Sequence, residues 1–366
     1  MSYTLSNARA SDHDELLAYL LDAFKTNDPN HPAFDALYPD LFHATDSAMT
    51  RHRIIREDGK IRACVGWYPM RVAMGEITVD VFGIGQVSCA PSLRGGGRMT
   101  NLLEDVCARM DKSGAALSWL GGRRDRYAHF GWESAGSNFH SWLDSRSVGE
   151  PPAGWTVKQI DPAATPAAWS IRERAAVREK ITRPLWLERM MRGGKPHRVF
   201  LAWRGDRKTP DAMCVAQAEG SNDLLEWAGD NDGIRAILAH ILKTQNHISV
   251  TYAPKSADPA AELFWNSASG NSASLSSLRI LDLDVLLKSY EPWILKRKPA
   301  SAAVKLAITS GAPVISNTAL ALDRLTMTRL LFGPLPPSHV IDLPPRLRWL
   351  DQVFPLPFIL PPSSHV

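Results

Sequence analysis

VDVFGIGQVSCAPSLRGGGRMTNLLEDVCARM, residues 79–110, is the stretch around which the rest of the chain is organised. Its pattern predicts a strand over Val79–Ala90, a loop over Pro91–Met99 and a helix over Thr100–Met110. Apolar residues recur in the helix at spacings of three and four, which places them on one face. These residues are Met99, Leu102, Leu103, Val106, Cys107 and Met110.

The loop before this helix has the composition of an anion site. A helix N-terminus leaves backbone N–H groups without intrahelical partners and carries the positive end of the helix dipole. Gly95, Gly96 and Gly97 put no side chains between an anion and the backbone, and Arg94 and Arg98 add positive charge. The stretch lacks both the Gly-Lys-Ser/Thr ending of a mononucleotide loop and the glycine spacing of a dinucleotide fold. It therefore predicts a phosphate site of another kind.

The strand end V-S-C-A-P and the R-x-x-G-x of the loop resemble the pyrophosphate loop of the GNAT N-acetyltransferases. The resemblance implies acetyl-CoA as cosubstrate. Its pantetheine amides would pair with the strand edge at Val87, Ser88 and Cys89. Its pyrophosphate would lie on the loop and the first helical turn, which comprise Arg94, Gly95, Gly96, Gly97, Arg98, Met99 and Thr100. The alternative is a glycine-rich turn that merely links strand to helix.

Composition limits the other possibilities. A length of 366 residues suggests two or three domains, and 45% apolar with 22% charged residues is typical of a soluble globular protein. A net charge of +4 is too weak to predict a nucleic-acid partner. Four scattered cysteines without C-x-x-C spacing predict reduced thiols and no metal site. No long apolar run or signal peptide is present, so we expect a cytoplasmic protein without a membrane span.

The order of elements in the first part also matches the GNAT order. We expect a strand over Tyr3–Ala8, an amphipathic helix, and a short helix around Ala33–Tyr38. A meander of strands follows, with turns at Asp58-Gly59 and Gly75-Glu76, and leads into the strand at residue 79. A further strand is expected over Ala115–Leu120.

A second motif, GGRRDRYAHFGWE at residues 121–133, resembles the Y-x-x-F-G-[YW] of GNAT enzymes. The resemblance implies that Tyr127 is the general acid that returns a proton to the leaving thiolate, a role within reach of a phenol. Gly122 and Arg123 match, more loosely, positions near the cofactor. The alternative is a core tyrosine packed against Phe130 and Trp132.

The strands and the helix expected over residues 198–254 echo the β-β-α-β order of the first part, and a smaller α/β section follows them. This arrangement of two GNAT-like halves and a smaller section resembles, over essentially the whole length, the Eis-type (enhanced intracellular survival) acetyltransferases. This resemblance implies an α+β (mixed α/β) fold: a catalytic GNAT domain over 1–148, a degenerate second GNAT-like copy over 149–277, and a sterol-carrier-protein-like domain over 278–366. The acidic loop Ala228–Gly233 of the second copy predicts that it binds no cofactor. In the third domain we expect a strand at Ile280–Val285 and helices over Ser316–Gly333. A homo-oligomer, a hexamer in that family, is also implied.

The last residues, VFPLPFILPPSSHV (Val353–Val366), are apolar and rich in proline, which predicts a docked tail because a solvated terminus is usually polar. The resemblance implies that the terminal carboxylate of Val366 enters the active site as the general base. Its unperturbed pKa of about 3.3–3.7 is low for that task, so His365 is an alternative base. A tail packed purely for assembly is the other alternative.

Together these features predict an acetyl-CoA-dependent N-acetyltransferase that acts on a primary amine directly in a ternary complex, without a metal. The resemblance suggests aminoglycosides, polyamines or lysine side chains as acceptors and does not choose among them. Two alternatives are a non-catalytic acyl-CoA-binding sensor and a hydrophobic-ligand carrier. Residues that could attract or enclose a cationic amine are Asp22, Asp28, Asp35, Asp40, Phe24 and Trp67. An ordinary solvated surface is the alternative, and we favour it for most of them.

Overall fold

The structure, a computed structural model, describes residues 3–25, 28 and 30–366. The first part of the chain contains every element predicted for it. Its strands are β1 (Thr4–Asn7), β2 (His52–Glu57), β3 (Lys60–Met74), β4 (Ile77–Cys89), β5 (Leu117–Leu120) and β6 (Glu133–Leu143). Its helices are α1 (His13–Lys25), α2 (Phe34–Leu37), α3 (Asp46–Met49), α4 (Arg98–Met110), α5 (Arg124–Tyr127) and α6 (Ser145–Val148).

The middle part alternates strands and helices. Its elements are β7 (Trp155–Ile160), α7 (Pro166–Arg172), β8 (Val177–Glu179), α8 (Arg183–Arg189), β9 (Arg198–Arg204), β10 (Ala212–Ala216), β11 (Asp223–Gly229), α9 (Asn231–Ile241), β12 (Ile248–Tyr252), α10 (Ala261–Asn266) and β13 (Gly270–Ile280). The last part has α11 (Leu283–Ser289), α12 (Glu291–Arg297), β14 (Lys305–Ile308), β15 (Val314–Ile315), β16 (Ala319–Leu322), α13 (Arg324–Phe332), α14 (Pro337–Val340) and α15 (Leu350–Val353).

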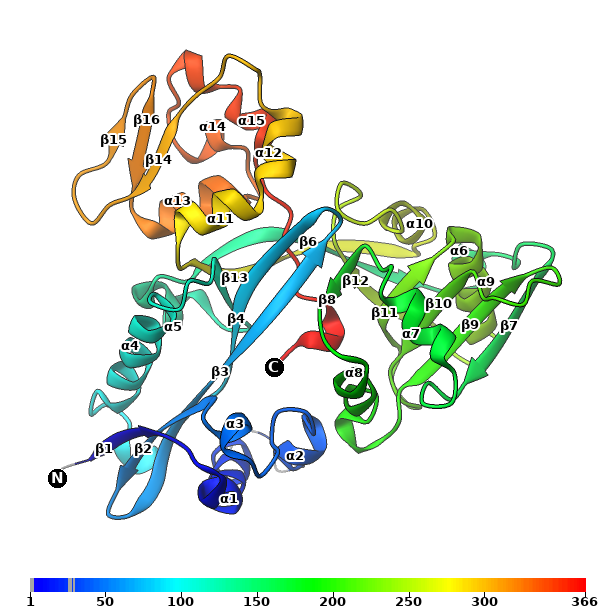
Figure 1. The fold of residues 1–366 in the computed structure, drawn as a ribbon, viewed down its shortest axis with the longest axis horizontal. Coiled ribbons are helices and arrows are strands. Elements are labelled where there is room, and N and C mark those ends of the chain that lie inside the picture. Colours follow the sequence, from blue (N-terminus) through cyan, green and yellow to red (C-terminus); the bar gives the residue numbers. More distant parts are fainter. Residues whose placement is uncertain (1–2, 26–27, 29) are drawn as a thin grey trace.

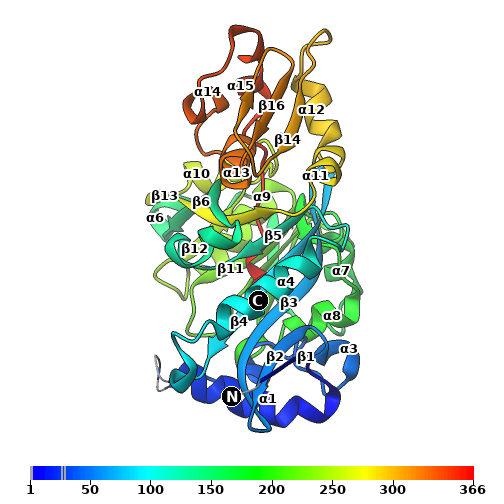
Figure 2. The same cartoon turned by 90° about the vertical axis from the view of Figure 1, so that its left-hand side faces the viewer.

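One continuous sheet joins the first two parts. Among the described residues it has thirteen strands in the order β1-β2-β3-β4-β5-β13-β6-β12-β11-β10-β9-β7, with β8 paired to β3. The last part has a sheet of its own, β14-β16-β15. Figures 1 and 2 show this last part standing apart from the large sheet, while the end of the chain returns to the centre of the molecule beside β3 and β8.

β4 and β5 separate after a short paired stretch, and this separation creates the opening on which the site depends. They run parallel and pair from Val81–Leu117 to Ile84–Leu120. Beyond Ile84, β4 continues to Cys89 with β3 as its partner, and the register shifts by a bulge at Gln86. Residues 85–89 therefore have no described strand partner on the side away from β3.

Two predictions for the last part were wrong. The strand expected at Ile280–Val285 ends at Ile280, and α11 begins at Leu283 because the Asp282 carboxylate caps it by accepting from Val285 N at 3.0 Å. Residues 316–333 are helical only from Arg324 onward, since Ala319–Leu322 form β16. The boundary predicted at residues 277 and 278 falls inside β13, which lies between β5 and β6.

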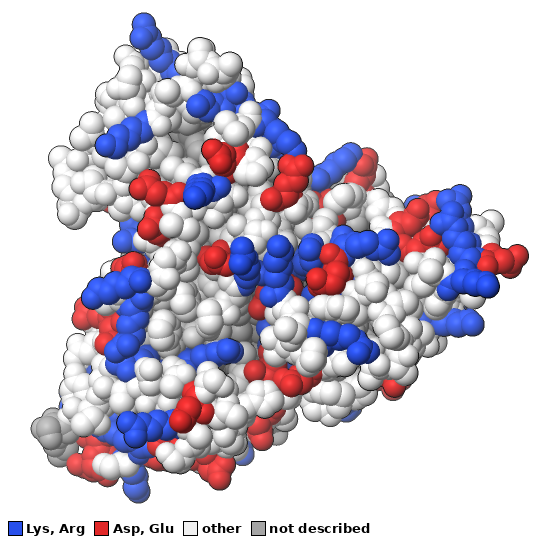
Figure 3. Space-filling view, viewed as in Figure 1, with Lys and Arg blue, Asp and Glu red and all other residues white. Residues whose placement is uncertain are grey.

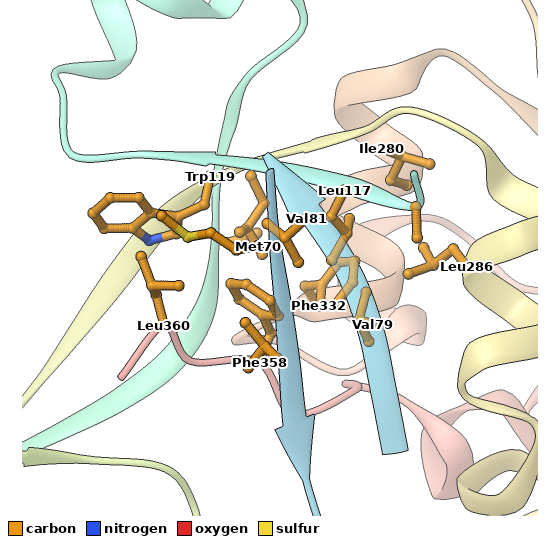
Figure 4. Close-up of a cluster of buried hydrophobic side chains, with 14 of the residues drawn as sticks. Met70, Val79, Val81, Leu117, Trp119, Ile280, Leu286, Phe332, Phe358 and Leu360 are labelled. Atoms are coloured by element: carbon orange, nitrogen blue, oxygen red, sulfur yellow. The ribbon is translucent and has the colours of Figure 1, made fainter. Parts of the chain in front are cut away.

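The two faces of the first half of the sheet are covered differently. The apolar face of α4 packs on one face together with Phe82, Ile84 and Trp132. The other face is covered by α1 and by the end of the chain. Figure 4 shows Phe358 and Leu360 lying against Met70, Val81 and Trp119 of the sheet. Five large apolar side chains of this tail are at most 4% exposed. They are Phe354, Leu356, Phe358, Ile359 and Leu360.

Candidate functional site

The glycine loop leaves the start of α4 accessible. Gly95, Gly96 and Gly97 are exposed, and no side chain among the described residues caps the helix. Gly97 is the N-cap and has a left-handed backbone, with φ of 73°, a conformation that residues with a side chain rarely adopt. Backbone N–H groups of the first turn are thus available to an anion. Met99 is half-buried and Thr100 is exposed at the same turn.

The two arginines of the loop differ in their surroundings. Arg98 folds back, donating to Glu57 Oε1 at 3.1 Å and to the Gly96 carbonyl at 2.9 Å, and it lies over the ring of Tyr3. Its charge is therefore shared with a buried carboxylate. Arg94 is exposed and forms no ion pair with any residue the structure describes. Arg94 is the loop's more available positive charge.

The free edge of β4 presents backbone rather than side chains. The hydroxyl of Ser88 is buried and donates to the Gln86 carbonyl at 3.2 Å. Burial raises the pKa of the half-buried Cys89 thiol, which keeps it protonated and a poor nucleophile. Val87 is half-buried on the same edge. The three residues are arranged as a hydrogen-bonding strand edge and not as a nucleophilic centre.

Tyr127 lies on α5, which follows the end of β5. Its half-buried ring packs against Trp132, with centroids 6.3 Å apart and rings nearly perpendicular, and against Gly122, where a Cβ would come within 2.5 Å of the ring. Burial raises the pKa of Tyr127 despite the nearby charge of Arg126. No described residue forms a hydrogen bond with its hydroxyl. Arg123 is exposed and pairs with Asp125 at 2.7 Å.

The end of the chain lies on β4 just before the bulge. A Cβ on Gly85 would lie 3.0 Å from the carboxyl carbon of Val366, and a Cβ on Gly83 would lie 2.8 Å from Val366 Cγ2. Both glycines therefore permit this close approach. His365 stacks on Trp119 with centroids 5.0 Å apart. Desolvation, reinforced by the charge of Arg192, lowers the pKa of His365.

A buried cluster of charges from the first and middle parts holds the last residues. Arg192 donates to the carbonyls of Ser363 at 3.1 Å and His365 at 2.7 Å, and Arg189 donates to Ser364 Oγ at 3.3 Å. Asp40 bridges both arginines, at 3.0 Å from Arg189 and 2.7 Å from Arg192. Although burial opposes ionisation, hydrogen bonds and charges from these two arginines lower the pKa of Asp40.

The structure contradicts the role suggested for two of the residues that were to attract or enclose a cationic amine. Asp40 is buried and paired with arginines, so its charge is not available to a ligand. Trp67 stacks on Phe82, with centroids 5.3 Å apart, on the α4 face of the sheet, which is opposite the tail. Asp28 and Asp35 are exposed.

The end of β4 joins features from three parts of the chain. The chain terminus lies at Gly83 and Gly85, the free edge follows, and the glycine loop comes directly after it. The end of β5, opposite Ile84, leads into α5 with Tyr127. A free strand edge, an anion-accessible helix end and a terminal carboxylate along β4, with a phenol on the short helix after β5, suit transfer of a group carried by a phosphorylated ligand.

A hollow with a volume of about 710 Å³ lies beside this opening. Its lining includes Tyr68 and Met70, which also lie next to Gly85 and Gly83 respectively. The lining also includes Arg51, Arg71, Lys180 and Asp80. On the face of the molecule drawn in Figure 3, basic side chains gather around the middle. None of the glycine loop, Tyr127 or Val366 belongs to this lining.

Two other kinds of feature are absent from the described residues. No group of three or more histidine, cysteine, aspartate or glutamate side chains there is arranged to hold a metal ion. None of the helices in the described part of the chain has the length and apolar character needed to cross a membrane. All four cysteines are free thiols.

Comparisons with known proteins identify the domain in the first part and the fold. Residues 4–135 match the family model of an acetyltransferase (GNAT) domain. None of the curated proteins matches the chain. Among solved structures, a GCN5-related N-acetyltransferase from Anabaena variabilis is similar with a TM-score of 0.70 at 15% identity, covering 96% of this chain and 97% of that one.

Two further solved structures are similar over most of their lengths. A probable N-acyltransferase from Enterococcus faecalis has a TM-score of 0.69 at 16% identity, with 90% of each chain covered. Eis1 from Mycobacterium abscessus has a TM-score of 0.65 at 15% identity, covering 96% of this chain and 97% of that one. Identities this low establish likeness of fold, and the predicted mixed α/β class with a GNAT fold is confirmed.

Proposed function

We propose that this chain, an acyltransferase whose first part is a GNAT acetyltransferase domain, transfers an acetyl group from acetyl-CoA directly to a primary amine. The observation that carries the proposal is the convergence at the end of β4. There the uncapped, glycine-lined start of α4 adjoins a strand edge without a partner, and Val366 lies beside the same strand.

The residues of the opening suit the coenzyme part by part. The open start of α4 at Gly97, at the end of the exposed turn Gly95–Gly97 and with Arg94 nearby in the loop, suits a diphosphate. The free edge at Val87–Cys89 suits the amides of a pantetheine arm, which pair with backbone as an added strand does. Gly122 and Arg123 would border the arm where β5 ends. Arg98 would act mainly by keeping the loop in place, because it is bound to Glu57.

The chain's own groups would supply the polarisation and the two proton transfers that acyl transfer requires. Backbone N–H groups of the β4 edge polarise the thioester carbonyl and stabilise negative charge on its oxygen. The carboxylate of Val366 takes a proton from the amine as the amine attacks. Tyr127 donates its proton to the departing thiolate, and its raised pKa keeps that proton in place at neutral pH.

His365 is the competing base. Its lowered pKa keeps the imidazole neutral near pH 7, as a base requires. However, its ring lies flat on Trp119, and its neighbour Val366 is the residue in contact with Gly85. We therefore favour the carboxylate and keep His365 as the alternative.

The proposal also states that the middle part of the chain, the second GNAT-like copy, binds no coenzyme. At the start of α9, the Asp230 carboxylate itself accepts from Asp232 N at 2.8 Å and Gly233 N at 3.3 Å. A Cβ on Gly233 would lie 2.7 Å from the Trp155 ring. The position that is open in the first part is thus closed here by charge and by packing, which argues for a structural role in a three-domain chain.

Release of free thiol from acetyl-CoA tests the function. A panel comprising a polyamine, an aminoglycoside and a lysine peptide should contain at least one amine that stimulates release, with the N-acetylated form of each amine as its control. Acetyl-CoA binding without release on any amine would favour the sensor alternative. Absence of both binding and release would reject the acyltransferase site.

Gly85→Ala is expected to lower kcat about tenfold or more while leaving the Kd for acetyl-CoA within about twofold, because a displacement of about 1 Å in a catalytic group already has large effects on rate. The added Cβ would meet the carboxyl carbon of Val366 at 3.0 Å. Steady-state kinetics and calorimetry measure the two quantities.

Gly270→Ala is the matched control for this variant. It also adds a methyl group to a strand glycine, but its nearest neighbour is the Trp142 ring at an ordinary 3.5 Å. It should keep wild-type kcat. An unchanged kcat in Gly85→Ala would mean that the position of Val366 does not matter to turnover.

A further inference from the structure

The bulge of β4 depends on a residue with an unfavourable backbone conformation. Gln86 has φ of 50°, and among the described non-glycine residues only Asp58, in a hairpin turn, shares a positive φ. Left-handed backbone is unfavourable for a residue with a side chain and persists where surrounding interactions impose it. Gln86 lies between Gly85, which contacts the chain terminus, and the free edge at Val87–Cys89.

A buried hydrogen-bond network imposes this conformation. The Tyr68 hydroxyl donates to Gln86 Oε1 and lies 2.9 Å from His52 Nε2. His52, Tyr68 and Gln86 are at most 6% exposed. Loss of one partner from such a network leaves a buried polar group unsatisfied, which is costly. The Gln86 carbonyl, in turn, accepts from Ser88 Oγ at 3.2 Å, so the bulge is held from two sides.

Two glycines, Gly66 and Gly85, leave the space that the network and the chain terminus occupy. A Cβ on Gly66, which faces Gly85 across β3 and β4, would lie 2.5 Å from Gln86 Oε1, so a side chain there would displace the network. The Tyr68 ring lies 3.5 Å from the position of a Cβ on Gly85, which itself faces the Val366 carboxyl carbon. Tyr68 therefore supports the bulge by its hydroxyl and the position of the terminus by its ring.

Charge does not enter this network at neutral pH. Burial lowers the pKa of His52 to about 4, so its imidazole is neutral. Burial raises the pKa of Tyr68 well above its usual range, so the phenol keeps its proton. The network therefore acts through geometry.

We propose that Tyr68 is a positioning residue: acting through Gln86, it fixes the bulge so that the free β4 edge is directed at the acyl carbonyl. This inference rests on the proposed function, because it assumes that the edge polarises a thioester. Tyr68 itself does not touch the reacting atoms; it sets the backbone that does.

Tyr68→Phe, Gln86→Ala and the double variant test the proposal. Each single change should lower kcat about 10- to 100-fold with the Kd for acetyl-CoA within about threefold, because misplaced donors affect the reacting carbonyl more than the bound arm. The double variant should lose no more than the worse single one, since both changes break one unit. The infrared stretch of a ¹³C-labelled acetyl carbonyl, bound to each variant, should move toward its frequency in water.

Tyr252→Phe is the matched control. Tyr252 is also buried, at 1% exposure, and its hydroxyl lies 2.8 Å from Ser141 Oγ in the other half of the sheet. This variant should lose thermal stability like Tyr68→Phe while keeping kcat and the wild-type carbonyl frequency. The comparison separates a positioning effect from general destabilisation.

Two results would overturn the proposal: an unchanged carbonyl frequency and kcat in folded Tyr68→Phe, or losses in the double variant that multiply. A wild-type chain that neither binds acetyl-CoA nor releases thiol would instead reject the proposed function itself, which is measured first. The two failures are therefore distinguishable.

Discussion

A chain extended by a few glycines beyond Val366 is expected to lose turnover by about 10²–10⁴, the usual contribution of one catalytic base, while its affinity for acetyl-CoA stays unchanged. The extension moves the terminal carboxylate away from Gly85, where it lies in the present chain. It leaves His365 with its stacking on Trp119 and with the hydrogen bond that its carbonyl accepts from Arg192. Thiol release and calorimetry measure the two quantities.

Two substitutions make this result interpretable. Val366→Ala keeps both the chain length and the carboxylate, and should retain most of the turnover. His365→Phe keeps an aromatic ring on Trp119 but removes the imidazole, and should also retain turnover if the carboxylate is the base. Full activity of the extended chain with loss in His365→Phe would transfer the role to His365 and contradict the assignment of Val366.

Tyr127→Phe should lower kcat by about 10²–10⁴ without weakening acetyl-CoA binding, because it removes the only proton assigned to the leaving thiolate. Burial raises the pKa of this phenol above its ordinary 10.0. A raised pKa means that the acid form persists as pH rises through neutrality, so wild-type kcat should not decline between about pH 7 and pH 9 from loss of this proton. The pH profile of kcat for both forms checks this expectation.

The structure favours a chemical rather than a structural cause for that loss. No described residue bonds to the Tyr127 hydroxyl, so removing it should change the free energy of unfolding little. Tyr290→Phe is the opposite control: its buried hydroxyl donates to the Pro357 carbonyl at 2.7 Å, so it should lower stability and spare kcat. Wild-type kcat in Tyr127→Phe would return Tyr127 to the alternative of a packed core tyrosine.

Local patterns predicted the first part of the fold well. The strand expected at Val79–Ala90 is β4, Ile77–Cys89, and the helix expected at Thr100–Met110 is α4, Arg98–Met110. Apolar spacing and glycine turns fix such elements within a few residues along the chain. β13 was missed because its place between β5 and β6 depends on pairing with residues more than a hundred positions away.

The candidate site likewise has local motifs that the sequence predicted and long-range contacts that it did not. The glycine loop and the motif around Tyr127 are contiguous in sequence and were predicted from it. Three interactions between distant segments could not be predicted from the periodicity of the sequence. They are the ion pair of Arg98 with Glu57, the pairing of buried Asp40 with arginines, and the hydrogen bond between Tyr68 and Gln86. The G-x-G at Gly83 and Gly85 was the available signal that another backbone approaches this strand closely.

The central claim is that the open start of α4 binds a diphosphate. Calorimetric comparison of coenzyme A with pantetheine, which lacks the diphosphate and the adenosine 3′-phosphate attached to it, tests this claim most directly when adenosine 3′-phosphate alone is measured as the control. Two charge-assisted hydrogen bonds are worth at least about 100-fold in affinity, so coenzyme A should bind at least that much more tightly. Arg94→Met should narrow the difference. Equal affinities for the two compounds, or no binding of coenzyme A, would contradict the account.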